Sequence, residues 1–494
     1  MIIPRVWRVA ALGLCVVVSA NAQYRISVGD CQRIRLYRSV AGDDRLGHAV
    51  ARAGDVTGDG FVDVLVGAPF YDSGKRPGKY DNGAVYLLMG SKLAVSPSSE
   101  IDLASLDDLG VMMVGAVGTQ VGSTLAGLGD MNEDGFADIA IGAGLGHQAA
   151  VVFGSTAFPP TFQLNTGPVK STILLNSGAS VAAAGDVNGD GFLDAIFGNP
   201  YADLVMNKGK ETYVGKVTVL FGSNSIPKTL DANDPGDAGF TIRGPGNELL
   251  GTSVCGVGDV NQDGFDDIAL SAQAAGESHR GITYLVCGAA EQSAPTEYRL
   301  VVDNGGGDIA RTGDVNNDGF GDFLICSNDY RALLVWGNSQ IGGRVDLNSS
   351  VPPTVGVLFL GAATGAGGGD INGDGVPDIV FGLPYQSVND LPAAGQVVVL
   401  FGGTSWPPVV DLLAPEVLHI TIDGMVAQGG FGTSVAMIGD LDVDGYGDLV
   451  IGAPREGQTV DGESRAGGEV YILSGKYITR CLSEQAGPEP PRSP

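Results

Sequence analysis

The chain has 494 residues, of which 44% are hydrophobic and 17% charged, and its formal net charge at pH 7 is −28. This acidic balance indicates cation binding and argues against nucleic acid as a partner. A length near 500 residues would ordinarily suggest several domains, but an internal repeat predicts a single ring instead.

Residues 1–22 have the pattern of a secretory signal peptide. Arg5 and Arg8 precede an apolar stretch from Val9 to Ala20, and small residues at Ala20 and Ala22 form a cleavage pattern. The stretch is short for a membrane span, and an uncleaved N-terminal anchor is the alternative. We therefore expect a secreted or cell-surface-associated protein whose mature chain has no transmembrane segment.

One motif, GDVTGDGFVDVLVGAP at residues 54–69, recurs seven times. Each copy has Asp at positions one, five and nine, an oxygen-bearing side chain at position three and Gly at position six, counted from the leading Asp. Successive copies begin 55 to 75 residues apart, which indicates a repeat array. The leading aspartates are Asp55, Asp130, Asp186, Asp259, Asp314, Asp370 and Asp440.

These loops are not EF-hands, because an EF-hand needs a bidentate Glu at position twelve followed by a helix. Position twelve is apolar in every copy and lies in a short run such as VLVG or LVIG, typical of a buried strand. The sequence therefore predicts a calcium loop inside a β-hairpin. Its alternative is a hairpin turn without metal, since Asp, Asn and Gly favour turns, although converging carboxylates without a cation would repel one another.

About seven Ca²⁺ sites are expected, because Ca²⁺ prefers shells made of oxygen ligands. Side chains at positions one, three, five and nine would supply ligands together with the backbone carbonyl of position seven. The predicted ligands are Asp55, Thr57, Asp59, Phe61, Asp63; Asp130, Asn132, Asp134, Phe136, Asp138; Asp186, Asn188, Asp190, Phe192, Asp194; Asp259, Asn261, Asp263, Phe265, Asp267; Asp314, Asn316, Asp318, Phe320, Asp322; Asp370, Asn372, Asp374, Val376, Asp378; and Asp440, Asp442, Asp444, Tyr446, Asp448. By charge count, the first loop should bind calcium most weakly and the last most tightly.

Each repeat also predicts four strands. A strand of small residues precedes the loop, an apolar strand follows it, and a third strand such as GAVYLLMGS comes next. A weaker polar strand often follows, as in EIDLAS, TFQLN, EYRLVV, RVDLNS and VVDLLA. Seven such units predict an all-β fold, a seven-bladed β-propeller of four-stranded blades over residues 23–482.

The repeated frame resembles that of FG-GAP repeats and is similar to the seven-bladed propeller at the N-terminus of integrin alpha chains. Phe431–Val435 and Gly452–Pro454 show the frame most fully, and the resemblance covers about residues 31–481. Two features depart from those chains. All seven copies here keep the calcium loop, and no thigh, calf or transmembrane segment follows in this sequence.

The resemblance implies that calcium loops occupy one face and that ligands bind the opposite face, on loops between strands two and three and between blades. Here these loops carry aromatic and basic side chains, which suit a protein interface or a sugar platform. The alternative is local packing of each tyrosine on its blade. The residues are Phe70, Tyr71, Tyr80, Tyr201, Tyr213, Tyr330, Arg331, Tyr385 and Arg455.

The resemblance favours an adhesion module that binds an extracellular protein or glycan, or a partner chain. A polysaccharide-acting or lipid-acting enzyme is one alternative and a structural extracellular component another. FG-GAP repeats also occur in a phospholipase, where the chemistry belongs to a separate histidine-rich domain. The sequence holds no G-x-S-x-G, no HExxH and no Cys/His pairing, so it predicts that the chain is not an enzyme.

The two ends of the chain predict how the ring closes. The last blade has no good fourth-strand candidate downstream, so residues 34–38 are expected to complete it. That would bring Cys31 near Cys481, and a disulfide between them would close a very long loop; two free cysteines are the alternative. Residues 483–494 are expected to form a disordered Pro-rich tail.

The remaining cysteines, Cys255, Cys287 and Cys326, have no pairing that the sequence decides. Asn348 begins the one N-glycosylation sequon, which would be used only in a eukaryote.

Overall fold

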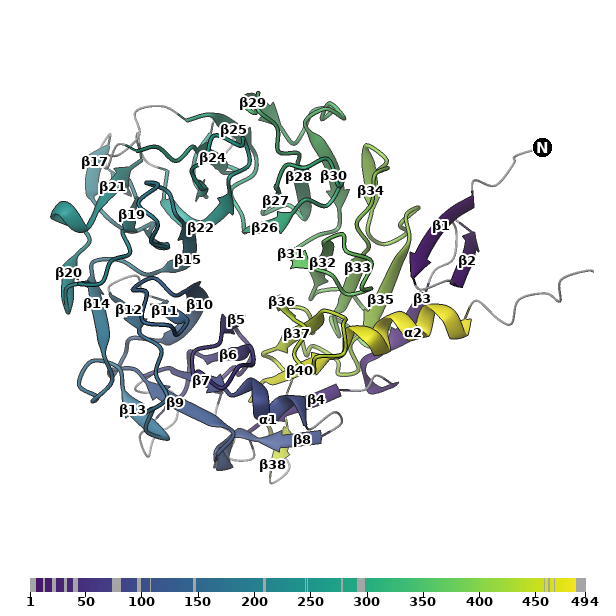
Figure 1. Ribbon diagram of the computed structural model, residues 1–494, viewed down its shortest axis with the longest axis horizontal. Coiled ribbons are helices and arrows are strands. Elements are labelled where there is room, and N and C mark those ends of the chain that lie inside the picture. Colours follow the sequence, from purple (N-terminus) through teal and green to yellow (C-terminus); the bar gives the residue numbers. More distant parts are fainter. Residues whose placement is uncertain are drawn as a thin grey trace, which may run out of the picture.

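Seven β-sheets stand around a ring, each with its first strand innermost and its last strands outside (Figure 1). This computed structural model describes the chain except for residues 1–5, 12–13, 20–23, 31–32, 39–42, 73–80, 96–98, 107, 145–147, 208–209, 245, 247, 277–278, 291–297, 457, 461–462, 466 and 486–494. The predicted all-β, seven-bladed propeller is thereby confirmed.

Four antiparallel strands build each blade, running from the inside of the ring outwards. The strands of blades one to three are β5 (Val50–Gly54), β6 (Asp63–Ala68), β7 (Ala84–Leu88), β9 (Gly110–Val114); β10 (Val121–Gly129), β11 (Asp138–Ala143), β12 (Gln148–Val152), β14 (Ser171–Leu175); and β15 (Ser180–Gly185), β16 (Asp194–Asn199), β19 (Lys216–Leu220), β21 (Gly239–Arg243). Those of blades four and five are β22 (Leu250–Gly258), β23 (Asp267–Ala272), β24 (Ile282–Val286), β25 (Leu300–Asp303); and β26 (Ile309–Gly313), β27 (Asp322–Cys326), β28 (Arg331–Val335), β30 (Gly356–Leu360). Those of blades six and seven are β31 (Thr364–Gly369), β32 (Asp378–Leu383), β33 (Gln396–Leu400), β35 (His419–Asp423); and β36 (Ser434–Gly439), β37 (Asp448–Ala453), β40 (Glu469–Leu473), β4 (Arg33–Tyr37).

A short fifth strand runs parallel to the outer edge of six blades; within the described ranges, blade three has none. The fifth strands of blades one, two, four, five, six and seven are β13 (Thr161–Gln163), β20 (Thr229–Asp231), β29 (Gly343–Asp346), β34 (Val409–Asp411), β3 (Tyr24–Ser27) and β8 (Ser99–Asp102). Except for β3, each comes from the segment between strands three and four of the following blade.

This exchange corrects part of the strand assignment. The segments EIDLAS, TFQLN, RVDLNS and VVDLLA are expected to be the outer strands of their own blades, but they form the fifth strands of the preceding blades. Only EYRLVV contributes a fourth strand, β25. Their polar character fits an outermost strand that pairs along one edge and faces solvent with the other.

The N-terminal strands close the ring. β4 pairs antiparallel with β40, with Arg33 opposite Leu473, so the prediction that residues 34–38 complete blade seven is confirmed. The sequence did not predict β3, which pairs parallel with β35 of blade six. Cys31 lies outside the described residues, and so does the side chain of Cys481, so their disulfide stays a prediction. Cys255, Cys287 and Cys326 are free thiols.

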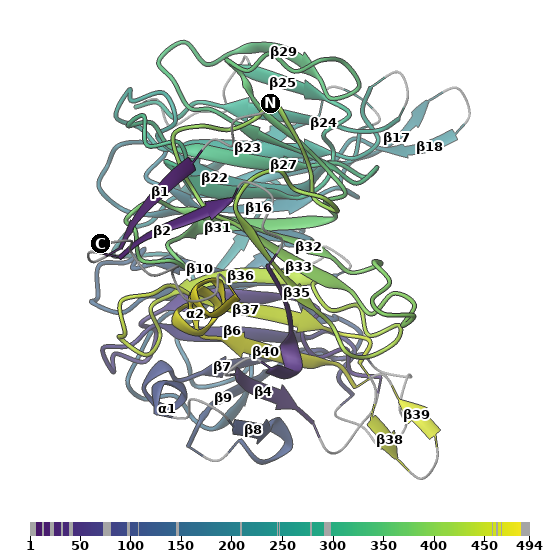
Figure 2. The same cartoon turned by 90° about the vertical axis from the view of Figure 1, so that its right-hand side faces the viewer.

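Figure 2 shows that the two faces of the ring differ. The helices α1 (Gly90–Ala94) and α2 (Gly475–Gln485) lie on one face, which we call the lower face; the hairpins β17–β18 (Leu204–Asn207, Lys210–Tyr213) and β38–β39 (Gln458–Val460, Glu463–Arg465) project from the other, the upper face. Both helices directly follow third strands, so the third strands end at the lower face. First strands run in the same direction as third strands, so the loops between strands one and two also lie at the lower face. The sequence did not predict α2, whose Ile478 is buried.

Two parts of the N-terminal region and three short turns complete the described structure. The predicted signal peptide holds β1 (Val6–Ala11) and β2 (Leu14–Ser19), which pair with each other, and its other residues lie largely outside the described ranges. The turns are the 3₁₀ helices η1 (Val28–Asp30), η2 (Leu103–Ser105) and η3 (Gly236–Ala238).

Crowding around the axis explains the small residues of the inner strands. A Cβ on Gly256 of β22 would lie 2.5 Å from the carbonyl oxygens of Ala183 and Ala184 in β15 of the neighbouring blade. The hydrophobic core lies between neighbouring blades, where the apolar second and third strands of one blade pack on those of the next. The inner strands therefore set how closely the blades approach one another.

Candidate functional site

The seven predicted calcium loops lie on the lower face and fold in the same way. They are loops one to seven: Asp55–Asp63, Asp130–Asp138, Asp186–Asp194, Asp259–Asp267, Asp314–Asp322, Asp370–Asp378 and Asp440–Asp448. In loop one, the N–H groups of Asp59 and Gly60 donate to the two carboxylate oxygens of Asp55 at 3.0 and 2.9 Å. The same pair of hydrogen bonds recurs in the other six loops. The leading Asp thus wraps the backbone around itself.

Two backbone positions in each loop are left-handed. The glycine at position six has φ between 86° and 98°, as its predicted role requires. Position four is also left-handed, which the sequence analysis missed although Gly or Asn stands there in four of the seven loops. The fourth residues are Gly58, Glu133, Gly189, Gln262, Asn317, Gly373 and Val443, with φ between 55° and 71°.

The Asp at position nine is a buried clamp between strands. In loop three, Val187 N–H donates to Asp194 Oδ2 at 3.0 Å, and Gly222 N–H, just after β19, donates to Oδ1 at 2.9 Å. All seven loops place this Asp in the same way, and burial raises its pKa: to about 6 for Asp63 and to about 7 for Asp138, Asp194, Asp267, Asp322 and Asp448. Besides its predicted place as a ligand, this residue therefore joins the loop to the third strand.

Position three shows whether the loops fit a cation. The Oδ1 atoms of Asn132, Asn261 and Asp442 are buried and have no hydrogen-bond partner among the described residues. A buried acceptor without a donor is rare in folded proteins, and a bound cation would satisfy it. The oxygen-rich donor sets of loops two, four and seven therefore fit Ca²⁺.

Loops three, five and six hold their third-position amide differently. In loop three, Asn188 Nδ2 donates to Asp190 Oδ2 at 2.9 Å, while Asn188 Oδ1 accepts from the N–H of Asp190. Loops five and six repeat this arrangement through Asn316 and Asn372. These amides must turn before their oxygen could join a cation, which sets the three loops apart from loops two, four and seven.

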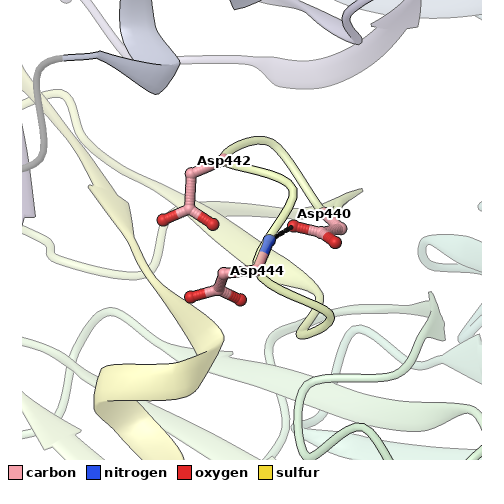
Figure 3. A group of neighbouring side chains, drawn as sticks. All are labelled: Asp440, Asp442 and Asp444. Atoms are coloured by element: carbon pink, nitrogen blue, oxygen red, sulfur yellow. Dashed lines mark hydrogen bonds between the residues drawn. The ribbon is translucent and has the colours of Figure 1, made fainter.

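Loop seven alone has carboxylates at positions one, three and five. One oxygen each of Asp440, Asp442 and Asp444 lie within 4.8 Å of one another, and no other cluster of three His, Cys, Asp or Glu ligands was found in the described part of the chain (Figure 3). Burial and the neighbouring carboxylates raise the pKa of Asp442. Lys476 of α2 places its Nζ 3.7 Å from Asp444 Oδ2 and offsets part of this negative charge.

On the upper face, some of the predicted ligand residues meet across blades. The rings of Tyr330 (blade five) and Tyr385 (blade six) pack edge to face at 6.2 Å, and the Arg455 guanidinium (blade seven) lies 5.6 Å from the Tyr385 ring. Tyr201 and Tyr213 form a second pair on blade three at 5.7 Å. Tyr201, Tyr330 and Tyr385 remain 53%, 51% and 54% exposed, so they are accessible to a ligand.

Other predicted ligand residues are held within their own surroundings. Phe70 and Tyr71 are half-buried beneath the guanidinium groups of Arg45 and Arg38, at 4.4 and 4.8 Å. Arg331 forms an ion pair with Asp329 and donates hydrogen bonds to Leu347 O and to the exposed Asn348. Tyr80 lies outside the described residues. The predicted ligand residues thus divide into two groups. Tyr330, Tyr385 and Arg455 form a cross-blade row, whereas Phe70, Tyr71 and Arg331 are held by local contacts.

Comparisons with known proteins agree with this architecture. The FG-GAP repeat family matches residues 47–88, 177–220, 250–286 and 431–473, which lie in blades one, three, four and seven. Integrin alpha pat-2 of Caenorhabditis elegans is 40% identical over 181 residues, 33% of this chain and 13% of its own length. Mouse integrin alpha-3 is 37% identical over 117 residues, 24% of this chain and 10% of its own.

A more extended similarity corrects the prediction that the chain is not an enzyme. Human phosphatidylinositol-glycan-specific phospholipase D is 28% identical over 468 residues, and its bovine counterpart is 26% identical over 450. These alignments cover 90% and 88% of this chain, which spans about half the length of these relatives. Catalytic motifs are local sequence patterns, so their absence says little here, whereas the similarity to these enzymes extends along the blades.

The described residues include no helix long and apolar enough to cross a membrane. The same assignment follows from the four FG-GAP matches, the similarity to integrin alpha chains and the seven blades. The chain carries an integrin alpha-like FG-GAP β-propeller.

Proposed function

We propose that this propeller is a calcium-dependent, ligand-binding module of adhesion type that works outside the cell or at its surface. Its upper face would take an extracellular protein or glycan, or a partner chain. The observation that carries the proposal is the accessible row of Tyr330, Tyr385 and Arg455 across three adjacent blades. Aromatic rings beside an arginine provide both apolar area and directed charge for a ligand.

The same proposal assigns Ca²⁺ to the seven loops, about one ion per blade. Positions one, three, five and nine, with the position-seven carbonyl, would hold each ion through oxygen. Loops two, four and seven should bind most tightly, because their third-position oxygens already lack a donor. Bound calcium would neutralise part of the lower-face charge and fix the loops that start each second strand.

Metal analysis and thermal unfolding test the calcium assignment. We expect several Ca²⁺ per chain at millimolar calcium, a melting temperature that rises with calcium, and poor substitution by Mg²⁺, which prefers a smaller octahedral shell. An Asn132→Leu variant should lose one tightly held Ca²⁺ ion. Two ions or fewer at saturation, or an unchanged melting curve in excess chelator, would reject the assignment.

A binding screen tests the ligand face. The chain would be applied to a glycan array and to a panel of purified extracellular proteins, in calcium and in chelator. For a ligand so found, Tyr385→Ala and Arg455→Ala should each weaken binding roughly tenfold or more, as interface anchors do. Lys228→Ala, on the connection between blades two and three, is the matched control. Equal binding by all variants would exclude the cross-blade row.

The extended similarity to the phospholipases favours a second candidate, a part in acting on phosphatidylinositol-glycan lipids. Here the propeller would hold such a lipid or its glycan, and the release of a glycan-anchored protein from vesicles would measure the activity. Release by the chain in calcium supports this candidate. Capture without release supports the adhesion module.

A further inference from the structure

The outer edge of blade three has no partner strand among the described residues. On each of the other six blades a fifth strand runs parallel to the fourth, but no strand lies beside the outer edge of β21 in the part of the chain that the structure describes. β20, the neighbouring fifth strand, belongs to blade two. An unpaired strand edge presents free N–H and C=O groups to any extended segment that fits.

The length of one connection explains why this edge is open. Wherever strands three and four of one blade are joined through a fifth strand on the preceding blade, the connection takes 18 to 21 residues, as in residues 89–109 and 153–170. The corresponding connection of blade four, residues 287–299, has 13. It also lacks the succession of a large apolar residue, a polar residue and an apolar residue that the fifth strands share. The described part of the chain, which leaves out residues 291–297 of this connection, therefore supplies no strand for this place.

The backbone of β21 matches that of fourth strands that do accept a partner. In blade one, the third residue of β9, Met112, donates its N–H to Pro160 O at 2.9 Å, and the last residue, Val114, accepts from Leu164 N–H at 3.1 Å. Blades two and five repeat both bonds. β21 starts with Gly like β9, and its third and last residues are Thr241 and Arg243. We expect their N–H and C=O to face the open side in the same way.

The six fifth strands show what such a partner must contain. In four of them, the residue opposite the last residue of the fourth strand is Asp: Asp102, Asp231, Asp346 and Asp411. The residues on both sides of that Asp are apolar and buried, as Val410 and Leu412 are beside Asp411. The shared pattern is a large apolar residue, Asp, then Leu or Ala.

Charge and apolar contact on blade three suit this pattern. The residue that would face the Asp is Arg243, whose side chain is 49% exposed and pairs with Asp203, itself 38% exposed. Beside it, Ile242 is buried and packs with the half-buried Phe240 and Tyr298 in the core between blades three and four. An apolar residue before the Asp would lie next to Ile242, as Val410 lies opposite Phe359.

We propose that the outer edge of blade three docks an extended peptide of a partner protein with the pattern apolar–Asp–Leu. The peptide would add as a parallel fifth strand through Thr241 and Arg243 and place its Asp against the guanidinium. This mode of recognition takes affinity from backbone hydrogen bonds and specificity from alternate side chains. The site lies on the outer rim of blade three, whereas the row of Tyr330, Tyr385 and Arg455 lies on blades five to seven, so the two sites can be tested separately.

The test uses the full chain and a synthetic peptide with the sequence of residues 406–414, whose Asp is that of β34. Saturable binding should weaken at least tenfold with Thr241→Pro, which removes the outward N–H, and with Arg243→Asp. A peptide with Lys in place of the Asp should bind Arg243→Asp better than the parent chain. Arg455→Ala, on the upper face, should leave peptide binding unchanged, which separates this site from the ligand face.

Three outcomes would overturn the proposal: no binding of either peptide at millimolar concentration, undiminished binding to both edge variants, or no charge-swap recovery. Self-association of the chain that Arg243→Asp abolishes would assign the edge to a second copy and so contradict a partner peptide. If Thr241→Pro does not fold, as its melting curve would reveal, the charge swap alone decides.

Discussion

The Asp at position nine shows how one residue serves two purposes. Its two oxygens accept backbone N–H groups from the loop and from the residue after strand three, and it is fully buried in six of the seven loops. From sequence it can be recognised only as a calcium ligand, because its second donor stands 15 to 28 residues downstream. A contact over such a variable separation leaves no local pattern.

Asp194→Asn should therefore destabilise the chain even without calcium. The amide offers one oxygen to two backbone N–H donors, Val187 and Gly222, so one of them is left buried and unpaired at a cost of about 2 kcal/mol. Urea unfolding in excess chelator at pH 8, above the raised pKa of Asp194, would measure it. The control is Asp190→Asn in the same loop, whose residue is exposed and should change stability by less than about 0.5 kcal/mol. Equal losses of stability in the two variants would contradict this role of Asp194 in joining the loop to the residue after strand three.

Val443 in loop seven occupies a backbone conformation that suits it poorly. Its φ is 59° and its side chain is 72% exposed, so little packing compensates for the left-handed geometry. Asn317 has the same place in loop five, with φ 58°. We expect Val443→Asn to stabilise the chain by about 1 kcal/mol in urea unfolding. Glu133, the equivalent residue of loop two, is not β-branched, so Glu133→Asn should increase stability less. A loss of stability in Val443→Asn would contradict this expectation.

At the scale of elements, the strands that recur in every blade are predicted from sequence better than the strands that pair with the preceding blade. The first three strands of each blade follow from periodicity, small residues and the loop motif, since these are local signals. Whether a polar strand such as residues 409–411 joins its own blade or the preceding one depends on pairing between segments far apart in the chain. Helix α2 was not predicted; it begins directly after the third strand of blade seven and includes the first three residues of the expected Pro-rich tail, 483–494, whose other residues lie outside the described ranges.

β34 offers a test of this exchange. Val410 is 2% exposed and Val409 is 49% exposed, because the strand packs one face onto blade five. Val410→Ala should lower the free energy of unfolding by about 2 kcal/mol through lost burial and a small cavity. Val409→Ala, the adjacent residue of the same type, should change it by less than about 0.5 kcal/mol. If the two variants were equally stable, β34 would not be packed as a fifth strand.

For the whole molecule, the decisive feature is how the ring closes. β4 brings Arg35 to blade seven, where its guanidinium is bound by both oxygens of Glu469. Tyr471 Oη lies 2.9 Å from Glu469 and 2.6 Å from Glu456, which is 2% exposed. One hydroxyl proton cannot serve two carboxylates, so a second proton is needed. Glu469 already accepts two N–H groups of Arg35, so Glu456 is the carboxyl that holds the second proton, and burial raises the pKa of Glu456 to about 8.

This proton makes ring closure depend on pH. In the unfolded chain Glu456 ionises near its ordinary pKa of 4.5, whereas in the folded chain it stays protonated until about pH 8. Its contribution to stability is therefore complete below pH 4.5 and is lost as pH rises towards 8, by at most about 1.4 kcal/mol per pH unit. Glu456→Gln carries a permanent N–H donor in the same place and escapes this loss.

The variant Glu456→Gln should match the parent chain near pH 5 and exceed it in stability increasingly up to pH 8. Urea unfolding of both proteins at pH 5, 6.5 and 8 in saturating calcium measures the difference, in which pH effects of the calcium loops cancel. The exposed Glu416→Gln should follow the parent at every pH. Parallel curves for the parent and Glu456→Gln would show that Glu456 is already ionised in the folded ring.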